Sequence, residues 1–104
     1  MKNILLVCAA GMSTSMLVDK MKKAAEAKDE EIKIEASSGG DIKSHIEEAD
    51  VLLLGPQVSY LQEDYTKQYG GDNGIPVEVI DSLDYGTMNG EKVLNWALDL
   101  ISNA

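Results

Sequence analysis

The sequence predicts one α/β domain, built on a single four-stranded parallel sheet with helices on both faces. Two observations support this prediction. Four apolar segments of strand length alternate along the chain with four helical patterns, and that order is typical of a parallel sheet. The chain is 104 residues long and 44% hydrophobic, which suits a single domain with one core over residues 1–104.

The four predicted strands, 3–7, 32–36, 51–54 and 77–80, differ in how their apolar residues are spaced. The first and third are continuously apolar over most of their length, which is typical of central strands buried on both faces. The second and fourth alternate, which suits strands nearer an edge. With the two apolar strands in the centre, right-handed connections favour the strand order 2-1-3-4.

Helical periodicity fills the segments between these strands. The first helix begins near Ser13 and places Leu17, Met21 and Ala25 on one face. Further helices are predicted over 41–49, over 59–69 and from 90 or 91 to 102. Each crossover between consecutive strands therefore contains a helix, as a parallel sheet requires.

The charge of the chain narrows its possible partners. Eighteen acidic residues oppose nine basic ones, giving a net charge of −9, and every basic residue is a lysine. Such a surface repels nucleic acid and anionic lipid, so neither is expected as a partner. Without arginine the chain has no bidentate guanidinium clamp, and a bound phosphate must rely on amides, hydroxyls and lysine.

Cysteine and histidine usage also limits the function classes. One cysteine permits no internal disulfide, and the chain shows neither a signal peptide nor eighteen consecutive apolar residues. We therefore expect a soluble cytoplasmic protein. Cys8 and His45, the single members of their types, lie far apart in sequence, so no metal site and no cofactor is expected.

Cys8 is the predicted nucleophile because of its place in the chain. It follows the first apolar strand directly, at the point between strands one and three where ligands collect in such sheets. Loop amides and the start of the next helix favour an anion there, including the thiolate of Cys8 itself. The alternative is that Cys8 is core filler, since free cysteine is often buried. The predicted phosphate loop consists of Ala9, Ala10, Gly11, Met12, Ser13, Thr14 and Ser15.

Two polar residues elsewhere are possible secondary members of the site. Gln57 follows the third strand and Asp81 follows the fourth, so both belong to the same end of the sheet as Cys8. Gln57 is a candidate neighbour of the phosphate loop, and Asp81 is a candidate acid. Each has an equally good structural interpretation, as a cap or a turn residue.

The residues after Cys8 are similar to the signature of the low-molecular-weight tyrosine phosphatases, in which arginine and then serine or threonine follow a cysteine and five intervening residues. Here Thr14 stands at the arginine position and Ser15 follows it. The arginine of those enzymes holds the equatorial phosphate oxygens. Its absence predicts slow hydrolysis of a phosphate on Cys8, which suits a carrier of phosphoryl groups.

Three segments, 8–18, 49–57 and 76–86, together resemble the enzyme IIB components of the lactose/cellobiose (chitobiose) class of the bacterial sugar phosphotransferase system. The resemblance implies a four-stranded parallel α/β fold. It also implies that Cys8 is phosphorylated by the phosphohistidine of a IIA partner, within a phosphate loop over 9–15. The phosphoryl group would then pass to a sugar entering through the membrane component IIC.

Two alternatives remain open at this point. One is a small cysteine-dependent phosphatase-like or arsenate-reductase-like enzyme, which the missing arginine and the lack of a second cysteine disfavour. The other is a non-enzymatic flavodoxin-like binding module, suggested by the hydroxyl run Ser13, Thr14 and Ser15. The flavodoxin-like module is disfavoured because the chain has one strand fewer than flavodoxins and no clear aromatic pair to enclose a flavin.

Overall fold

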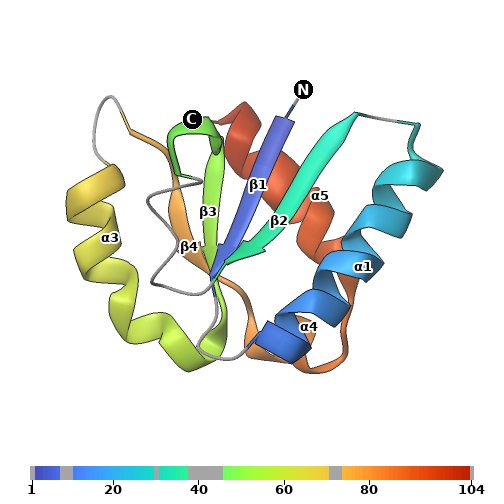
Figure 1. Ribbon diagram of the computed structural model, residues 1–104, viewed down its shortest axis with the longest axis horizontal. Helices are drawn as coiled ribbons and strands as arrows, with labels where there is room; N and C mark the ends of the chain where they lie inside the picture. Colours follow the sequence, from blue (N-terminus) through green and yellow to red (C-terminus); the bar gives the residue numbers. More distant parts are fainter. Residues whose placement is uncertain (1, 8–10, 30, 38–45, 71–73, 104) are drawn as a thin grey trace.

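The computed structural model describes residues 2–7, 11–29, 31–37, 46–70 and 74–103, and of 11–15 only the helical backbone. Its centre is a four-stranded sheet in the order β2-β1-β3-β4, and all three neighbouring pairs are parallel (Figure 1). The predicted sheet and strand order are therefore confirmed. The strands are β1 (Lys2–Val7), β2 (Ile32–Ser37), β3 (Val51–Leu54) and β4 (Val77–Val79).

Burial explains why β1 and β3 are central. All four residues of β3 are buried, as are the last four of β1, so neither strand has a face toward solvent. In β2 the burial pattern is mixed, and only Ile34 of this edge strand is buried. A strand covered on both sides must be apolar at every position, and this is the pattern that the sequence shows.

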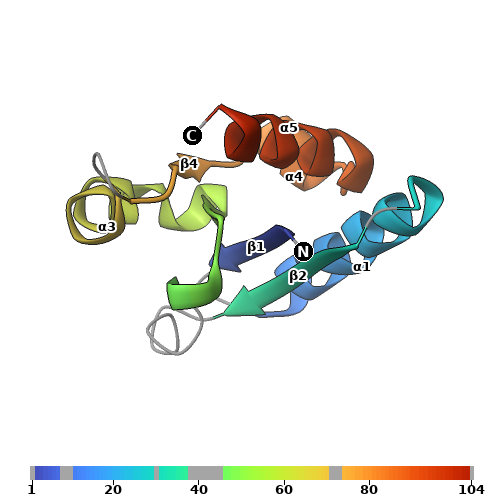
Figure 2. The same cartoon turned by 90° about the horizontal axis from the view of Figure 1, so that it is seen from above.

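The two faces of the sheet have separate cores. On one face Ile4, Leu6 and Leu53 pack with the helices α1 (Gly11–Ala27) and α5 (Gly90–Ser102). On the other face Leu5 and Leu52 pack with η3 (Pro56–Leu61) and the residues around it. Figure 2 shows α1 and α5 on one side of the sheet and α3 (Gln62–Tyr69) on the other. Because neighbouring strand residues point in opposite directions, one apolar strand supplies both cores.

Helices α1 and α5 approach each other closely at Gly90, the first residue of α5. A Cβ atom at this position would lie 2.5 Å from the carbonyl carbon of Lys20 and 2.6 Å from the backbone nitrogen of Met21. These are backbone atoms of α1, so they cannot move aside as a flexible side chain would. Glycine is therefore required where the two helices cross.

The structure differs from the sequence prediction in three helical segments. Within the segment predicted as a helix over 41–49, the described residues form only the short 3-10 turn η2 (Ile46–Glu48). The helix predicted over 59–69 is a 3-10 segment, η3, followed by α3, with a kink at Val58. The short helix α4 (Ser82–Gly86) was not predicted. The first and last helices are confirmed, although α1 begins slightly earlier than Ser13.

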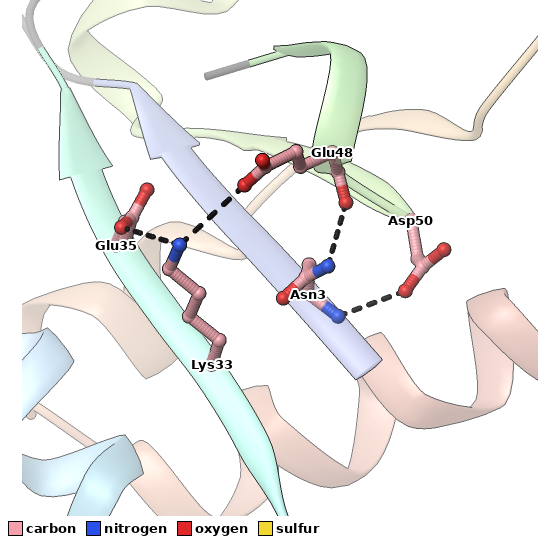
Figure 3. Close-up of polar contacts among 5 residues, drawn as sticks. All are labelled: Asn3, Lys33, Glu35, Glu48 and Asp50. Atoms are coloured by element: carbon pink, nitrogen blue, oxygen red, sulfur yellow. Dashed lines mark hydrogen bonds and ion pairs between the residues drawn. The ribbon is translucent and has the colours of Figure 1, made fainter. Parts of the chain in front are cut away.

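A polar network ties the strands together at the amino end of the sheet, where the parallel strands begin (Figure 3). The Asn3 backbone N–H donates to Asp50 Oδ2 at 2.8 Å, and Asn3 Nδ2 donates to the Glu48 carbonyl at 2.7 Å. Lys33 Nζ lies 3.2 Å from Glu35 and 3.5 Å from Glu48. The hydrogen bond that Lys33 donates to Glu35 and the charges of both carboxylates raise the pKa of Lys33. This network connects β1 and β2 to the segment that enters β3.

None of the described helices combines the length and the apolar character that a membrane span needs.

Candidate functional site

The carboxyl ends of three strands are aligned by backbone hydrogen bonds. Val7 ends β1 and pairs with Leu54, which ends β3 and pairs with Val79 of β4. Beyond the strands, the Gly55 N–H donates to the Val7 carbonyl at 2.9 Å, and the Ile80 N–H donates to the Leu54 carbonyl at 2.8 Å. The chain therefore leaves β1 toward Cys8 at a fixed position, directly beside the start of the segment after β3.

Helix α1 begins at Gly11, just beyond this exit. It is 17 residues long, and its first turn holds no acidic residue. A helix of this length has unpaired N–H groups and a partial positive charge at its N-terminus, which favour a bound anion. An acidic side chain in the first turn would compete for the same groups, so its absence suits phosphate binding.

Gly55 lies between the exit from β1 and two further side chains. A Cβ atom on Gly55 would lie 2.9 Å from Gln57 Oε1, 3.5 Å from Tyr85 Cε2 and 3.7 Å from the Val7 carbonyl oxygen. The side chain of Gln57 therefore folds back against Gly55, although the residue as a whole is exposed. Tyr85 is buried and packs against the same glycine. The place of Gln57 beside the phosphate loop stays a prediction, because Cys8, Ala9 and Ala10 lie outside the described residues.

Asp81 serves as the N-cap of α4. Its Oδ1 atom accepts a hydrogen bond from the Leu83 N–H at 2.7 Å, and the residue is exposed at the carboxyl end of the sheet. Asp84, in the same helix, pairs with Lys92 of α5 at 3.3 Å. The structural interpretation of Asp81 as a helix cap therefore describes what its side chain does here.

Three residues of the predicted site, Cys8, Ala9 and Ala10, lie outside the described residues, and so does His45, for which no site role is predicted. The rest of the predicted phosphate loop, Gly11, Met12, Ser13, Thr14 and Ser15, forms the start of α1, and its backbone alone is described. Within the described ranges, no three His, Cys, Asp or Glu residues are grouped so that they would hold a metal ion.

The sequence analysis did not identify Gly55 and Tyr85 as parts of this site. A glycine and a proline directly after a buried strand do mark a turn, and this signal pointed to Gln57. The contact between Gly55 and Tyr85 joins the segment after β3 to the helix after β4. Such a contact depends on the pairing of β3 with β4 and carries no local sequence signal.

The described part of this region favours a bound anion. The carboxyl end of β1 lies beside Gly55, and the N-terminus of the 17-residue helix α1 follows a few residues later in the chain. An amide side chain lies at the edge of the same region. On the β4 side, the carboxylate of Asp81 caps α4.

Comparison with known proteins identifies a family for this chain. Residues 3–95 match the family described as "PTS system, Lactose/Cellobiose specific IIB subunit". The chain is 45% identical over 103 residues to the oligo-beta-mannoside-specific EIIB component of Bacillus subtilis strain 168, and the match covers 99% of each protein. It is 44% identical over 106 residues to the galactose-specific EIIB component of Lactococcus lactis subsp. cremoris MG1363, covering 97% of each.

Two solved structures share the fold. The cellobiose-specific IIB component of Borrelia burgdorferi superposes with a TM-score of 0.80 at 43% identity, over 98% of this chain and 93% of that one. The lactose-specific IIB domain of Streptococcus pneumoniae superposes with a TM-score of 0.79 at 16% identity, over 95% of this chain and 96% of that one. At that low identity the second likeness shows the fold alone.

Proposed function

We propose a function for this chain from one premise: it belongs to the family of lactose/cellobiose-specific IIB subunits of the sugar phosphotransferase system. As a member of that family, it is a component of a system that transfers phosphoryl groups to sugars. The finer statement, which step the chain performs and with which residue, is our proposal. We propose that Cys8 accepts a phosphoryl group from a phosphohistidine on a IIA partner and passes it to a sugar at the membrane component IIC.

The proposed transfer has two displacement steps. In the first, the Cys8 thiolate attacks phosphorus, the S–P bond forms and the P–N bond to the donor histidine breaks, leaving the electron pair on the imidazole nitrogen. In the second, a sugar hydroxyl attacks the same phosphorus and loses its proton, while the S–P bond breaks and the thiolate is regenerated. Neither step needs an oxidant or a reductant, because no atom changes its oxidation state.

The observation that carries the proposal is the position of Cys8 between β1 and α1. The last residue of β1, Val7, is held by the Gly55 N–H at 2.9 Å, and α1 begins at Gly11. A phosphorylated thiol in this place adds negative charge where helix amides and the helix dipole favour it. The same arrangement favours the thiolate, which is both the nucleophile of the first step and the leaving group of the second.

The proposed phosphate loop supplies the remaining contacts. The small residues Ala9, Ala10 and Gly11 are proposed to leave backbone amides accessible to phosphate oxygens. Met12 follows in the first turn of α1, and Ser13, Thr14 and Ser15 are proposed to add hydroxyl donors. Gln57, whose side chain folds back over Gly55, is proposed to donate from its amide to the phosphoryl group.

Thr14 separates this proposal from a phosphatase. A cysteine phosphatase stabilises the transition state for hydrolysis with an arginine at this position, and threonine has no such cation. The phosphoryl group on Cys8 is therefore expected to wait for a sugar rather than react quickly with water. Because both proposed partners act at the inner side of the membrane, we propose the cytoplasm as the site of action.

The experiment that tests the proposal is phosphorylation of the full chain by its donor. The chain is incubated with phosphoenolpyruvate, the general phosphotransferase proteins and a IIA partner, and its intact mass is measured. We expect the mass to increase by one phosphoryl group, and peptide mapping under neutral conditions to place the group on Cys8. Cys8→Ser is the matched control and should remain unmodified. Modification of Cys8→Ser to the same extent as the wild type would contradict the proposal.

A further inference from the structure

A surface pocket lies between the edge strand β4 and the helices α4 and α5. Its volume is about 450 Å³, and it is lined by Val79, Asp81, Asp84, Lys92 and Trp96. These residues come from the end of β4, the segment after it, α4 and α5. Small-molecule sites in proteins span about 300–1,000 Å³, so the pocket is large enough to be one. We call it the Trp96 pocket.

Trp96 supplies an aromatic wall of this pocket. Its side chain is partly buried: it packs against the core on the α1 and α5 face of the sheet, and it also lines the pocket. Lys92 precedes Trp96 by four residues in α5, so the two side chains lie on the same face of this helix. An indole that the core holds in place offers a fixed apolar surface to a ligand.

Two carboxylates and a lysine supply the polar groups of the Trp96 pocket. Asp84 Oδ1 lies 3.3 Å from Lys92 Nζ, and the Asp84 side chain is only 14% exposed. Asp81 Oδ1 accepts a hydrogen bond from the Leu83 N–H at 2.7 Å. Each carboxylate is thus oriented through one oxygen, and neither Oδ2 atom has a hydrogen bond within the part of the chain that the structure describes. The pocket therefore offers two oriented acceptors and, in Lys92, a donor.

The charges of the pocket disfavour ionic ligands. Its two carboxylates outnumber its one lysine, so phosphate and other anions are repelled. A metal ion is also disfavoured, because the Lys92 ammonium already pairs with Asp84 and the described residues hold no group of three metal-binding side chains. An aromatic surface with acceptors and a donor beside it suits a neutral ring that carries several hydroxyl groups.

We propose that the Trp96 pocket binds a saccharide. The faces of a pyranose ring carry C–H bonds, which pack against the electron-rich face of an indole. The sugar hydroxyls would donate to the Oδ2 atoms of Asp81 and Asp84, and Lys92 would donate to a further sugar oxygen. None of the five lining residues belongs to the predicted phosphate loop, so this inference goes beyond the proposed transfer through Cys8 and does not depend on it.

Nuclear magnetic resonance tests the proposal at the pocket itself. Trp96 is the only tryptophan of the chain, so its indole N–H gives a single signal. The full chain, labelled with ¹⁵N, is titrated with cellobiose, and this signal and the backbone amides of Asp81 and Asp84 are followed. We expect their shifts to saturate with a Kd on the order of 1 mM. Sorbitol, an open-chain polyol without a ring face, should cause no saturable shift.

Variants assign the binding to the pocket. Asp81→Asn, which keeps a helix cap, and Asp84→Asn each replace a carboxylate by an amide of the same shape, and each should raise the Kd about fivefold. Trp96→Phe keeps a smaller ring and should raise it about threefold. Glu63→Gln is the matched control, because Glu63 pairs with Lys67 at 3.3 Å on α3, across the sheet from α5 (Figure 2). It should leave the Kd unchanged, and the amide spectrum of each variant shows whether it is folded.

Three outcomes would overturn the proposal. The first is the absence of saturable shifts with cellobiose up to about 100 mM. The second is an equal response to sorbitol, because the pocket would then not recognise a ring. The third is a Kd within about twofold of the wild type in both Asp81→Asn and Asp84→Asn, because the sugar would then bind elsewhere. Phosphorylation of Cys8 is measured separately, so none of these outcomes bears on the proposed function.

Discussion

The two ends of the sheet contrast in how their polar groups are used. At the amino end, Asn3 is fixed by hydrogen bonds to Asp50 and Glu48, and Lys33 joins two carboxylates beside it (Figure 3). At the carboxyl end, Gln57 is exposed and its side chain folds over a glycine next to the exit toward Cys8. The Asn3 side chain links β1 to the turn η2 by a hydrogen bond, whereas the Gln57 side chain lies against Gly55 two residues before it.

The contrast indicates which polar groups stabilise the fold and which are free to contact a ligand. A polar group that spans two elements contributes to stability when it is partly shielded from water. A polar group that is exposed above a glycine costs little to move and is free to contact a ligand. We therefore expect changes at the amino end to alter stability, and changes at the carboxyl end to alter phosphoryl transfer.

The largest expected effect lies in the helix layer that covers one face of the sheet. Gly90→Ala would place a Cβ atom 2.5 Å from the backbone of α1, so the two helices must separate. We expect a loss of about 2–3 kcal/mol in the free energy of unfolding, measured by urea denaturation. Phosphorylation of the folded fraction should be unchanged, because the crossing contains no residue of the proposed site.

Gly86→Ala is the matched control for that variant. A Cβ atom at Gly86 would meet nothing within 4 Å, so its stability should stay within about 0.5 kcal/mol of the wild type. Equal destabilisation by both variants would mean that the close approach of α1 and α5 does not require glycine.

Replacing the amide side chains of Asn3 and Gln57 with alanine, one at a time, tests the contrast between the two ends of the sheet directly. Asn3→Ala removes the hydrogen bond to the Glu48 carbonyl, and also a buried Oδ1 atom that has no partner within the described part of the chain. These effects oppose each other, so we expect a net loss of about 1 kcal/mol in stability and an unchanged phosphorylation rate. Gln57→Ala should leave stability within about 0.5 kcal/mol and slow phosphorylation about three- to tenfold.

Stopped-flow mixing with phosphorylated IIA measures the rate, and urea denaturation measures the stability of the same two proteins. The contrast would be broken if Asn3→Ala slowed transfer as much as Gln57→Ala. It would also be broken if Gln57→Ala were the less stable of the two.

A smaller effect separates the two interpretations of Asp81. Asparagine caps helices about as well as aspartate, whereas alanine does not, so Asp81→Asn should keep the stability and Asp81→Ala should lower it by about 1 kcal/mol. Neither variant should change the phosphorylation rate, because the carboxylate caps α4. A slower rate in Asp81→Asn, with stability retained, would instead identify Asp81 as an acid or base in the transfer.

Apolar patterning was sufficient to predict the sheet. The unbroken apolar runs of β1 and β3 identified them as central, and the strand order follows from that. The short helix α4 could not be found in the same way, because five residues are too few for an apolar period. Its signal is local instead: Asp81 suits an N-cap, and its side chain accepts a hydrogen bond from the Leu83 N–H.

From the sequence, only candidate site residues that come just after a strand could be assigned to an end of the sheet. Cys8 follows β1 directly in the chain, and Gln57 follows β3 after the turn at Gly55. Because the carboxyl ends of parallel strands lie at one edge of the sheet, the sequence predicts both residues at that edge. The packing of Tyr85 against Gly55 joins two distant segments, and no pattern within either segment reports it.

The lifetime of the phosphoryl group on Cys8 tests the central claim most directly. The phosphorylated chain is isolated, and its decay is followed by intact mass in buffer and with membranes that contain the matching IIC component, each with and without sugar. A carrier with threonine at position 14 should decay slowly in buffer and rapidly when membranes and sugar are both present. Hydrolysis within seconds in buffer, with no acceleration by membranes and sugar, would contradict the carrier function and favour a phosphatase.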